Sequence, residues 1–204
     1  RRFIAMLGPR NVTEFNYRYA DPGAAHIFVG VSLQDGGREK RGLIEALQAA
    51  DADADIRAIA FLGSEGCFTA GNDMADFMAF AMSGGKGRLV AGDFLHALVG
   101  VGKPIVSGVD GLAIGIGTTL NLHCDLTVAS SRSLFKTPFV DLALVPEAAS
   151  SLLVPRIVGH QRAFALLAMG EGFSAGEALS AGLIWKVVEP GAVELWVGPS
   201  SAVR

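Results

Sequence analysis

Short apolar segments with two different periods follow one another along this chain of 204 residues. Residues His26–Leu33 (HIFVGVSL) alternate at every second position, which is typical of a strand. Residues Arg41–Ala50 carry leucine and isoleucine at helical spacing and predict a helix. Residues Ile56–Leu62 form an apolar run that predicts a buried strand, followed by the loop GSEGCFTAGND. The residues before His26 show no pattern that we assign to an element.

The same succession continues as far as Val188. We predict helices over Met74–Met82, Arg88–Val101, Ala148–Ile157, Gln161–Ala168 and Ala175–Ala181. We predict strands over Ile105–Val109, Leu126–Ala129, Ser133–Lys136 and Trp185–Val188. Asp73 is suited to be the N-cap of the first of these helices. Short strands that alternate with helices favour an α/β fold, and residues 1–204 fit a single domain.

Half of the residues are apolar and only 18% are charged, which raises the question of membrane insertion. No stretch has the ~20 uninterrupted apolar residues of a spanning helix, because glycines, threonines and Asn121 interrupt the richest run, Gly111–Leu122. A subunit that buries one face in an oligomer explains the composition better. The net charge of −3 also argues against the basic stripe of a nucleic-acid binder. We therefore expect neither a membrane nor a nucleic acid as a partner.

The cysteines and histidines give no sign of a disulfide framework or a metal site. Cys67 and Cys124 are isolated, so we expect reduced thiols inside a cell. The histidines have no ligand-like spacing to one another. They are His26, His96, His123 and His160. The N-terminal RRFIAMLGPR lacks the long apolar stretch and cleavage site of a signal peptide. We expect a cytoplasmic protein with no metal.

Two glycine-bearing turns, each placed between a strand and a helix, are the most informative features. The first is FTAGND (residues 68–73) and the second is GLAIGIG (residues 111–117). The first N–H groups of the following helices lack intrahelical partners and lie at the positive end of the helix dipole. Either turn alone is most simply an ordinary turn, and no phosphate-loop motif is present. Together, the two turns can direct two amides at one negatively charged oxygen.

At these turns the sequence resembles the crotonase, or enoyl-CoA hydratase/isomerase, superfamily. IRAIAFLGSEGCFTAGNDMADF is similar to the first oxyanion segment of that family, and KPIVSGVDGLAIGIGTTLNLHCDLTVAS to the second. The stretch SLFKTPFVDLALVPEAASSLLVP continues in the family's order, and the resemblance extends over residues 56–189. It implies a spiral of strand–strand–helix turns and assembly into homotrimers or paired trimers.

The resemblance also implies a substrate and a site. The substrate is an acyl-CoA thioester, so coenzyme A enters with the substrate and no separate cofactor is expected. The backbone N–H groups of Asn72 and Ile116 are the implied oxyanion donors. The implied substrate-binding residues surround them and are Ala70, Gly71, Asp73, Met74, Phe77 and Gly115. Met74 and Phe77 are candidates for lining an acyl tunnel, although the apolar residues here are also typical of core.

Side chains around the oxyanion donors must select the reaction. Hydratases of the family carry two glutamates, one in the helix after the second glycine turn and one after a proline further on. This chain has Thr119 at the first position and Phe139 at the second. Neither residue can transfer a proton, and Asp141 is shorter and shifted by two positions. Hydration of a double bond is therefore disfavoured.

Glu147, in the segment VPEAASS, remains as the candidate proton carrier. The segment resembles the delta3,delta2-enoyl-CoA isomerase branch, in which a glutamate directly after the proline is the only base. We expect its apolar neighbours (Leu144, Val145, Leu152 and Leu153) to raise the carboxyl pKa. The alternative role is a carboxylate that complements the dipole of the helix predicted over Ala148–Ile157.

The two ends of the chain depart from the family pattern. REKR runs directly into GLIEALQAAD, and GAVELWVGPSSAVR follows Pro190 without the closing helices of the family. The leading hypothesis is an enoyl-CoA isomerase. The alternatives are an enoyl-CoA hydratase and, because of the ends, a non-catalytic acyl-CoA-binding or scaffold protein. A serine hydrolase is remote, since the G-x-S-x-G motif is missing.

Overall fold

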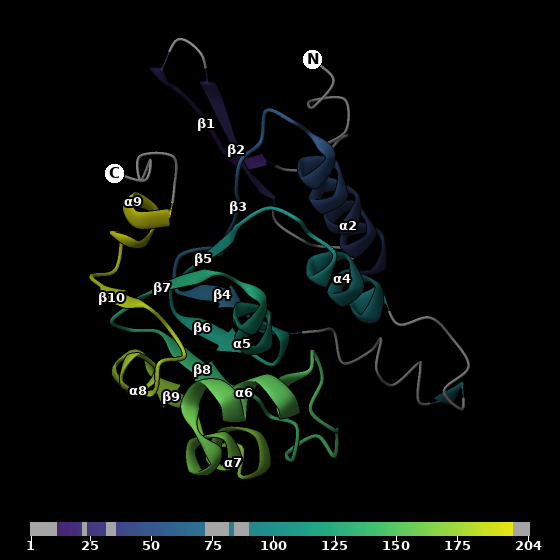
Figure 1. Cartoon of the computed structure of the whole chain (residues 1–204), viewed down its shortest axis with the longest axis vertical. Coiled ribbons are helices and arrows are strands. Elements are labelled where there is room, and N and C mark those ends of the chain that lie inside the picture. Colours follow the sequence, from purple (N-terminus) through teal and green to yellow (C-terminus); the bar gives the residue numbers. More distant parts are fainter. Residues whose placement is uncertain (1–11, 22–23, 32–35, 72–81, 84–89, 198–204) are drawn as a thin grey trace.

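The computed structural model describes residues 12–21, 24–31, 36–71, 82–83 and 90–197. Its centre consists of two four-stranded sheets (Figure 1). The first sheet is parallel, in the order β10 (Lys186–Val188), β7 (Leu126–Ser130), β5 (Ile105–Val109) and β3 (Ile59–Leu62). The second sheet has the order β4 (Cys67–Thr69), β6 (Leu112–Ile114), β8 (Leu134–Lys136) and β9 (Phe173–Ser174). Only β9 runs antiparallel to its neighbour in that sheet.

From β3 to β8, consecutive strands alternate between the two sheets. The chain passes from β3 to β4, from β5 to β6 and from β7 to β8, and each step places one strand in each sheet. Helices separate these strand pairs, so that each pair lies beside the previous one in both sheets. This is the predicted spiral of strand–strand–helix turns, and the α/β fold class is confirmed.

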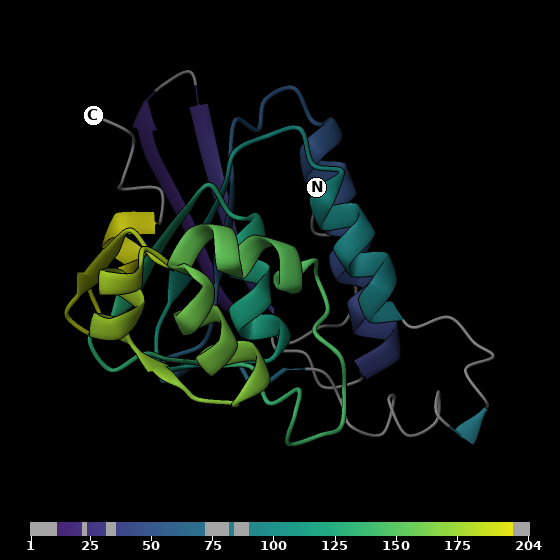
Figure 2. The same ribbon diagram turned by 60° about the horizontal axis from the view of Figure 1, so that its bottom comes forward.

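The helices lie around the two sheets (Figures 1 and 2). Their bounds are α2 Gly36–Ala52, α4 Val90–Val99, α5 Ile116–Thr119, the 3-10 helix η1 Leu120–His123, α6 Ser150–Val158, α7 His160–Ala168, α8 Ala175–Ala181 and α9 Val193–Val197. Helices α2 and α4 lie side by side in both views. The N-terminal strands β1 (Val12–Asp21) and β2 (Ala24–Val31) pair only with each other, as an antiparallel hairpin.

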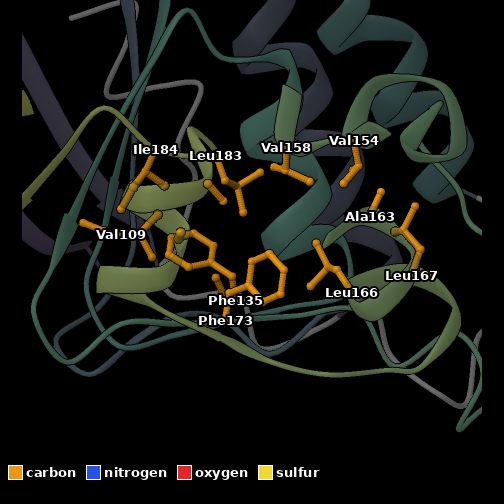
Figure 3. Close-up of a cluster of buried hydrophobic side chains, with 14 of the residues drawn as sticks. Val109, Phe135, Val154, Val158, Ala163, Leu166, Leu167, Phe173, Leu183 and Ile184 are labelled. Carbon is orange, nitrogen blue, oxygen red and sulfur yellow. The ribbon is translucent and has the colours of Figure 1, made fainter. Parts of the chain in front are cut away.

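Two apolar clusters fill the interior. The larger one joins the sheets to α6, α7 and α8 and contains Phe135, Val154 and Leu166, each at most 1% exposed (Figure 3). The smaller one joins α2, α4, β5 and η1 through Leu47, Leu98 and their apolar neighbours. The second cluster holds the start of β5 and the end of η1 in place, which fixes the helical segment that leaves the second glycine turn.

Most predicted elements are confirmed within two or three residues, and the differences have local causes. Strands β4 and β6 lie inside the segments predicted as loop and turn, because three residues are too few for an alternating pattern. Helix α6 begins at Ser150 rather than Ala148, since Ala148 and Ala149 have left-handed φ values of 52° and 53°. The hairpin strand β1, strand β9 and helix α9 were not predicted. The predicted helix Met74–Met82 lies outside the described residues except for Met82.

The described part of the chain contains no helix that is both long and apolar enough to cross a membrane. It also contains no group of three or more histidine, cysteine or acidic side chains placed to hold a metal ion. Cys67 and Cys124 are free cysteines, in agreement with the absence of a disulfide framework.

Candidate active site

The two glycine turns predicted from the sequence lie side by side. Strands β4 and β6 are parallel neighbours, with Cys67 opposite Leu112 and Thr69 opposite Ala113, so the turns that follow them leave the same edge of the sheet. A Cβ atom added at Gly115 would lie 4.0 Å from the Cα atom of Gly71. Their φ values are 58° and 99°, which glycine adopts without steric cost.

The close approach of the turns depends on a further glycine. A Cβ atom at Gly117 would lie 2.7 Å from Thr69 Cγ2 and 2.8 Å from Thr69 O, which is closer than atoms pack. Only a residue without a side chain therefore allows α5 to rest against the end of β4.

Ile116, the predicted oxyanion donor of the second turn, is the first residue of α5. Its backbone N–H makes no hydrogen bond within the part of the chain that the structure describes. Of the predicted substrate-binding residues, Gly71 and Gly115 lie next to each other, and Ala70 is exposed beside them. The other predicted residues of the first turn lie outside the described residues. They are Asn72, Asp73, Met74 and Phe77.

Hydrogen bonds of buried polar side chains fix the position of α5 and η1. Asn121 Nδ2 donates to Gly117 O at 2.6 Å, and its Oδ1 accepts from Ser107 Oγ at 2.6 Å. Thr118 Oγ1 donates to Ala113 O at 2.6 Å. Every fully buried side-chain nitrogen or oxygen among the described residues has a hydrogen-bond partner. Such satisfied networks make the position of the segment rigid.

Glu147 lies against this helical segment. Thr119 Oγ1 donates a 2.5 Å hydrogen bond to Glu147 Oε1, although 28 residues separate the two in the sequence. The carboxyl is half-buried, and its pKa is raised above the usual value because burial disfavours the ionised form. The Thr119 hydrogen bond and the charge of His123 oppose this rise in the pKa. The direction of the predicted pKa shift is confirmed.

The cause of that shift differs in part from the prediction. Val145 is 83% exposed and Leu152 is 51% exposed, so these two side chains shield the carboxyl poorly. Leu144 and Leu153 are half-buried. The alternative role of Glu147 as a dipole partner of the following helix is not supported, since the first turn of α6 contains no acidic residue and no side chain caps it.

The segment after Glu147 has an unusual backbone. Ala148 and Ala149 both adopt the left-handed conformation, which is sterically costly for residues with a Cβ atom. Ser150 stabilises the turn through its amide and its hydroxyl, which donate to Glu147 O at 2.9 and 2.6 Å. The imidazole Nε2 of His123 lies 2.9 Å from Ala148 O. Backbone strain of this kind is concentrated at functional sites in proteins.

The two positions that correspond to hydratase glutamates have other structural roles. Thr119 is buried and bonded to Glu147, and Phe139 is 5% exposed within the larger apolar cluster. Asp141, the possible substitute, has a side chain that is 54% exposed and pairs with Lys136 Nζ at 3.3 Å. Glu147 and Asp141 are therefore not brought together as a pair of carboxylates.

Sequence reasoning missed His123 and the hydroxyl of Thr119 as partners of the Glu147 segment. Both residues belong to the helical segment α5–η1, four positions apart, and contact a loop 25 to 28 residues further along the chain. Their helical spacing indicates a shared face. The sequence carries no signal for the loop that packs against it.

A family model described as enoyl-CoA hydratase/isomerase matches residues 39–195. The chain belongs to this family. Among its relatives, enoyl-CoA delta isomerase 2 of Rattus norvegicus is 35% identical over 151 residues, which are 71% of this chain and 38% of that protein. The peroxisomal bifunctional enzyme of Cavia porcellus is 35% identical over 153 residues, 75% of this chain and 21% of that protein.

The fold agrees with this assignment. The crystal structure of an enoyl-CoA hydratase from Mycobacterium marinum superposes with a TM-score of 0.74 and 30% sequence identity, and the match covers 92% of this chain and 89% of that one. Some of the similar proteins are thus named isomerases and others are named hydratases. The chain spans about a fifth to two fifths of the two relatives described above.

The N-terminal part of the chain also matches a second family model. Residues 1–55 match a family model described as the C-terminal regulatory domain of threonine dehydratase. This segment contains the β1–β2 hairpin and α2, and it overlaps the enoyl-CoA hydratase/isomerase match over residues 39–55. The departure of the first residues from the family pattern therefore coincides with a match to a different family.

Proposed function

We propose that this protein is an enoyl-CoA isomerase that moves the double bond of an acyl-CoA thioester from the β,γ to the α,β position, with Glu147 as the proton carrier. The observation that carries this proposal is the position of Glu147. Its half-buried carboxyl group accepts a hydrogen bond from Thr119. Thr119 ends helix α5, and the proposed oxyanion donor Ile116 begins the same helix three residues earlier.

The reaction requires one base and two hydrogen-bond donors. The thioester oxygen accepts hydrogen bonds from the N–H groups of Ile116 and Asn72. Glu147 removes a proton from the α carbon, the electron pair shifts to the thioester oxygen, and a dienolate forms. The protonated Glu147 then delivers the same proton to the γ carbon, which restores the thioester carbonyl and leaves the double bond between the α and β carbons. No water or further reactant is consumed.

Both parts of the site supply transition-state stabilisation of useful size. Removing one oxyanion donor costs about 3 kcal/mol in other enzymes, and a positioned general base contributes about 10²–10⁴-fold. Partial burial makes Glu147 a stronger base than an exposed glutamate because it raises the pKa of the carboxyl. Thr119 uses Oε1 as its acceptor, which leaves Oε2 for the substrate proton.

The environment of the other carboxylate supports isomerisation over hydration. Hydration needs a second acid or base to activate water, and Asp141 is instead paired with Lys136 on an exposed loop. Phe139 occupies the second glutamate position with a side chain in the apolar core. Hydratase activity is the second candidate, because similar proteins carry that name.

We also infer that the protein acts as a homotrimer or a pair of trimers. Large apolar side chains are exposed on α6, on α7 and its C-cap residue, and on the loop that precedes α6. They are Val140, Leu142, Val145, Leu152, Ile157, Phe164 and Met169. Contact between subunits would remove this surface from water. Sedimentation or light scattering measures the assembly, and a monomer at micromolar concentration would contradict the inference.

The decisive experiment uses two substrates and three proteins. Wild type, Glu147→Gln and the control Glu171→Gln are incubated with a 3-enoyl-CoA and, separately, with crotonyl-CoA. Glu171 is exposed, so its substitution is expected to leave the rates unchanged. We expect wild type and the control to isomerise 3-enoyl-CoA, and Glu147→Gln to lose at least about 10²-fold in rate. Hydration of crotonyl-CoA that survives in Glu147→Gln would refute the proposal, and binding without turnover would favour a scaffold.

A further inference from the structure

We propose that His123 is a positioning residue that holds the Glu147 segment by binding the carbonyl oxygen of Ala148. The inference rests on the proposed function of Glu147 and assigns a role to a residue outside the proton transfer itself. It starts from the 2.9 Å distance between His123 Nε2 and Ala148 O. Because a carbonyl oxygen only accepts hydrogen bonds, Nε2 must carry the proton and donate it.

The α5–η1 segment then contacts the Glu147 segment twice. Thr119 bonds the side chain of Glu147, and His123 bonds the peptide that directly follows Glu147. The two donors lie four positions apart on one helical segment. One contact orients the carboxylate, and the other fixes the backbone from which the carboxylate projects.

The backbone at this point needs an external contact to keep its shape. Ala148 and Ala149 are both left-handed, although neither is a glycine. Contacts within the turn come from Ser150, whose amide and hydroxyl reach Glu147 O. His123 supplies the hydrogen bond from a distant part of the chain, across 25 residues. Losing this bond would allow the alanines to relax towards the right-handed helix that their sequence favours.

The charged side chains around His123 are occupied by other partners. His123 lines a hollow of about 390 Å³ together with Lys103 and Asp125. Lys103 Nζ donates to Ala50 O and to Asp53 O, and Asp125 Oδ2 accepts from Ile105 N at 2.8 Å. The charge of His123 also lowers the pKa of Glu147, in opposition to burial. The hydrogen-bond contact of the imidazole is therefore with the Glu147 segment, whereas Lys103 and Asp125 bond to other residues.

The test compares His123→Leu, which removes the donor, with His123→Gln, whose amide reaches a similar position and can donate. His96→Leu is the matched control, because the exposed His96 of α4 also contacts a backbone carbonyl, Gly92 O, through Nδ1 at 2.7 Å. We expect His123→Leu to lower kcat for 3-enoyl-CoA about 10- to 100-fold, since small displacements of a catalytic group have effects of this size. KM should change less than about threefold. His123→Gln should retain most of the wild-type kcat, and His96→Leu should resemble wild type.

Hydrogen–deuterium exchange of the segment 147–153 gives a readout that does not need turnover. The amides of Leu152 and Leu153 both donate to Ala149 O and report whether the turn is held. We expect faster exchange in this segment in His123→Leu than in His96→Leu or His123→Gln. Unchanged exchange in His123→Leu would overturn the inference, and so would an unchanged kcat if the wild type is active.

The failure of the inference and of the proposed function are distinguishable. If wild type does not isomerise 3-enoyl-CoA, the proposed function fails, and the exchange data alone decide whether His123 holds the segment. If wild type is active and His123→Leu is equally active, only the role of His123 is refuted. A parallel fall of kcat in His123→Gln would also refute it, because that variant retains a donor.

Discussion

Thr119 Oγ1 donates a 2.5 Å hydrogen bond to Glu147 Oε1, and Thr119 occupies the position at which the family resemblance implies a glutamate in hydratases. The threonine at this position therefore has a structural role, because its hydroxyl donates a hydrogen bond to Glu147. A second carboxylate at this position would face the first at close range, and like charges at such a distance would shift both pKa values. In the proposed reaction a single carboxyl group, Glu147, removes and delivers the proton, and the neutral hydroxyl of Thr119 adds no second negative charge beside it.

Replacing this hydroxyl changes the pH dependence of the rate. Thr119→Val removes the donor, and because the hydrogen bond lowers the Glu147 pKa, that pKa should rise. The base must be ionised, so activity is present above the pKa and is lost as the pH falls through it. We expect the acid limb of the kcat profile to move to higher pH in Thr119→Val. Thr119→Ser, which keeps the hydroxyl, should show the wild-type limb, and equal limbs in both variants would contradict the prediction.

The raised pKa of Glu147 also predicts a stability effect. A carboxyl whose folded-state pKa exceeds its unfolded-state pKa stabilises the fold most when protonated, at pH values below the unfolded pKa. This contribution is lost as the pH rises through the folded-state pKa. Glu147→Gln cannot ionise, so we expect it to gain stability relative to wild type as the pH rises from 4 to about 7. Denaturant unfolding at several pH values measures the difference, and a gap that shrinks with rising pH would be the contrary result.

Relief of the strained turn should increase stability. Ala149→Gly allows the left-handed conformation without a Cβ penalty of about 1–2 kcal/mol, offset in part by the chain entropy of glycine. We expect a net gain of about 0.5–1 kcal/mol in the free energy of unfolding. Ala46→Gly, in the exposed right-handed part of α2, is the matched control and should lose about 1 kcal/mol. Equal losses in both variants would show that Ala149 is not strained.

A single added methyl group at Gly117 should separate the two glycine turns. Gly117→Ala places a Cβ atom 2.7–2.8 Å from Thr69, so the turns must move apart at a cost of about 1–3 kcal/mol. We expect activity on 3-enoyl-CoA to fall further than this loss of stability explains, because the donor N–H of Ile116 moves with α5. Gly176→Ala in α8 is the control, since nothing lies within 4 Å of the added methyl group. Full activity in Gly117→Ala would exclude the close approach as a requirement.

The sequence predicts the fold class and the place of the site because the apolar periods and glycine turns are local signals. Strands β4 and β6 were not predicted, because three residues are too few to show an alternating pattern. Pairing with neighbouring strands gives these residues their extended conformation. Alanine favours helices, so Ala148 was predicted to be helical, and contacts with distant residues override this preference. Phe139 lies in the larger apolar cluster, where an aromatic side chain is expected. The expectations for Asn72, Asp73, Met74, Phe77, the trimer and the cytoplasm stay predictions.

Helix α2 lies in the segment that matches two families, and its Leu47 packs with Leu98 and Ile105 in the smaller apolar cluster. An apolar core accepts different side chains as long as volume and pattern are kept. The packing of α2 in this cluster therefore depends on its apolar stripe more than on the identity of each side chain. The overlap of the two family matches, residues 39–55, falls mainly on this helix and ends before both glycine turns.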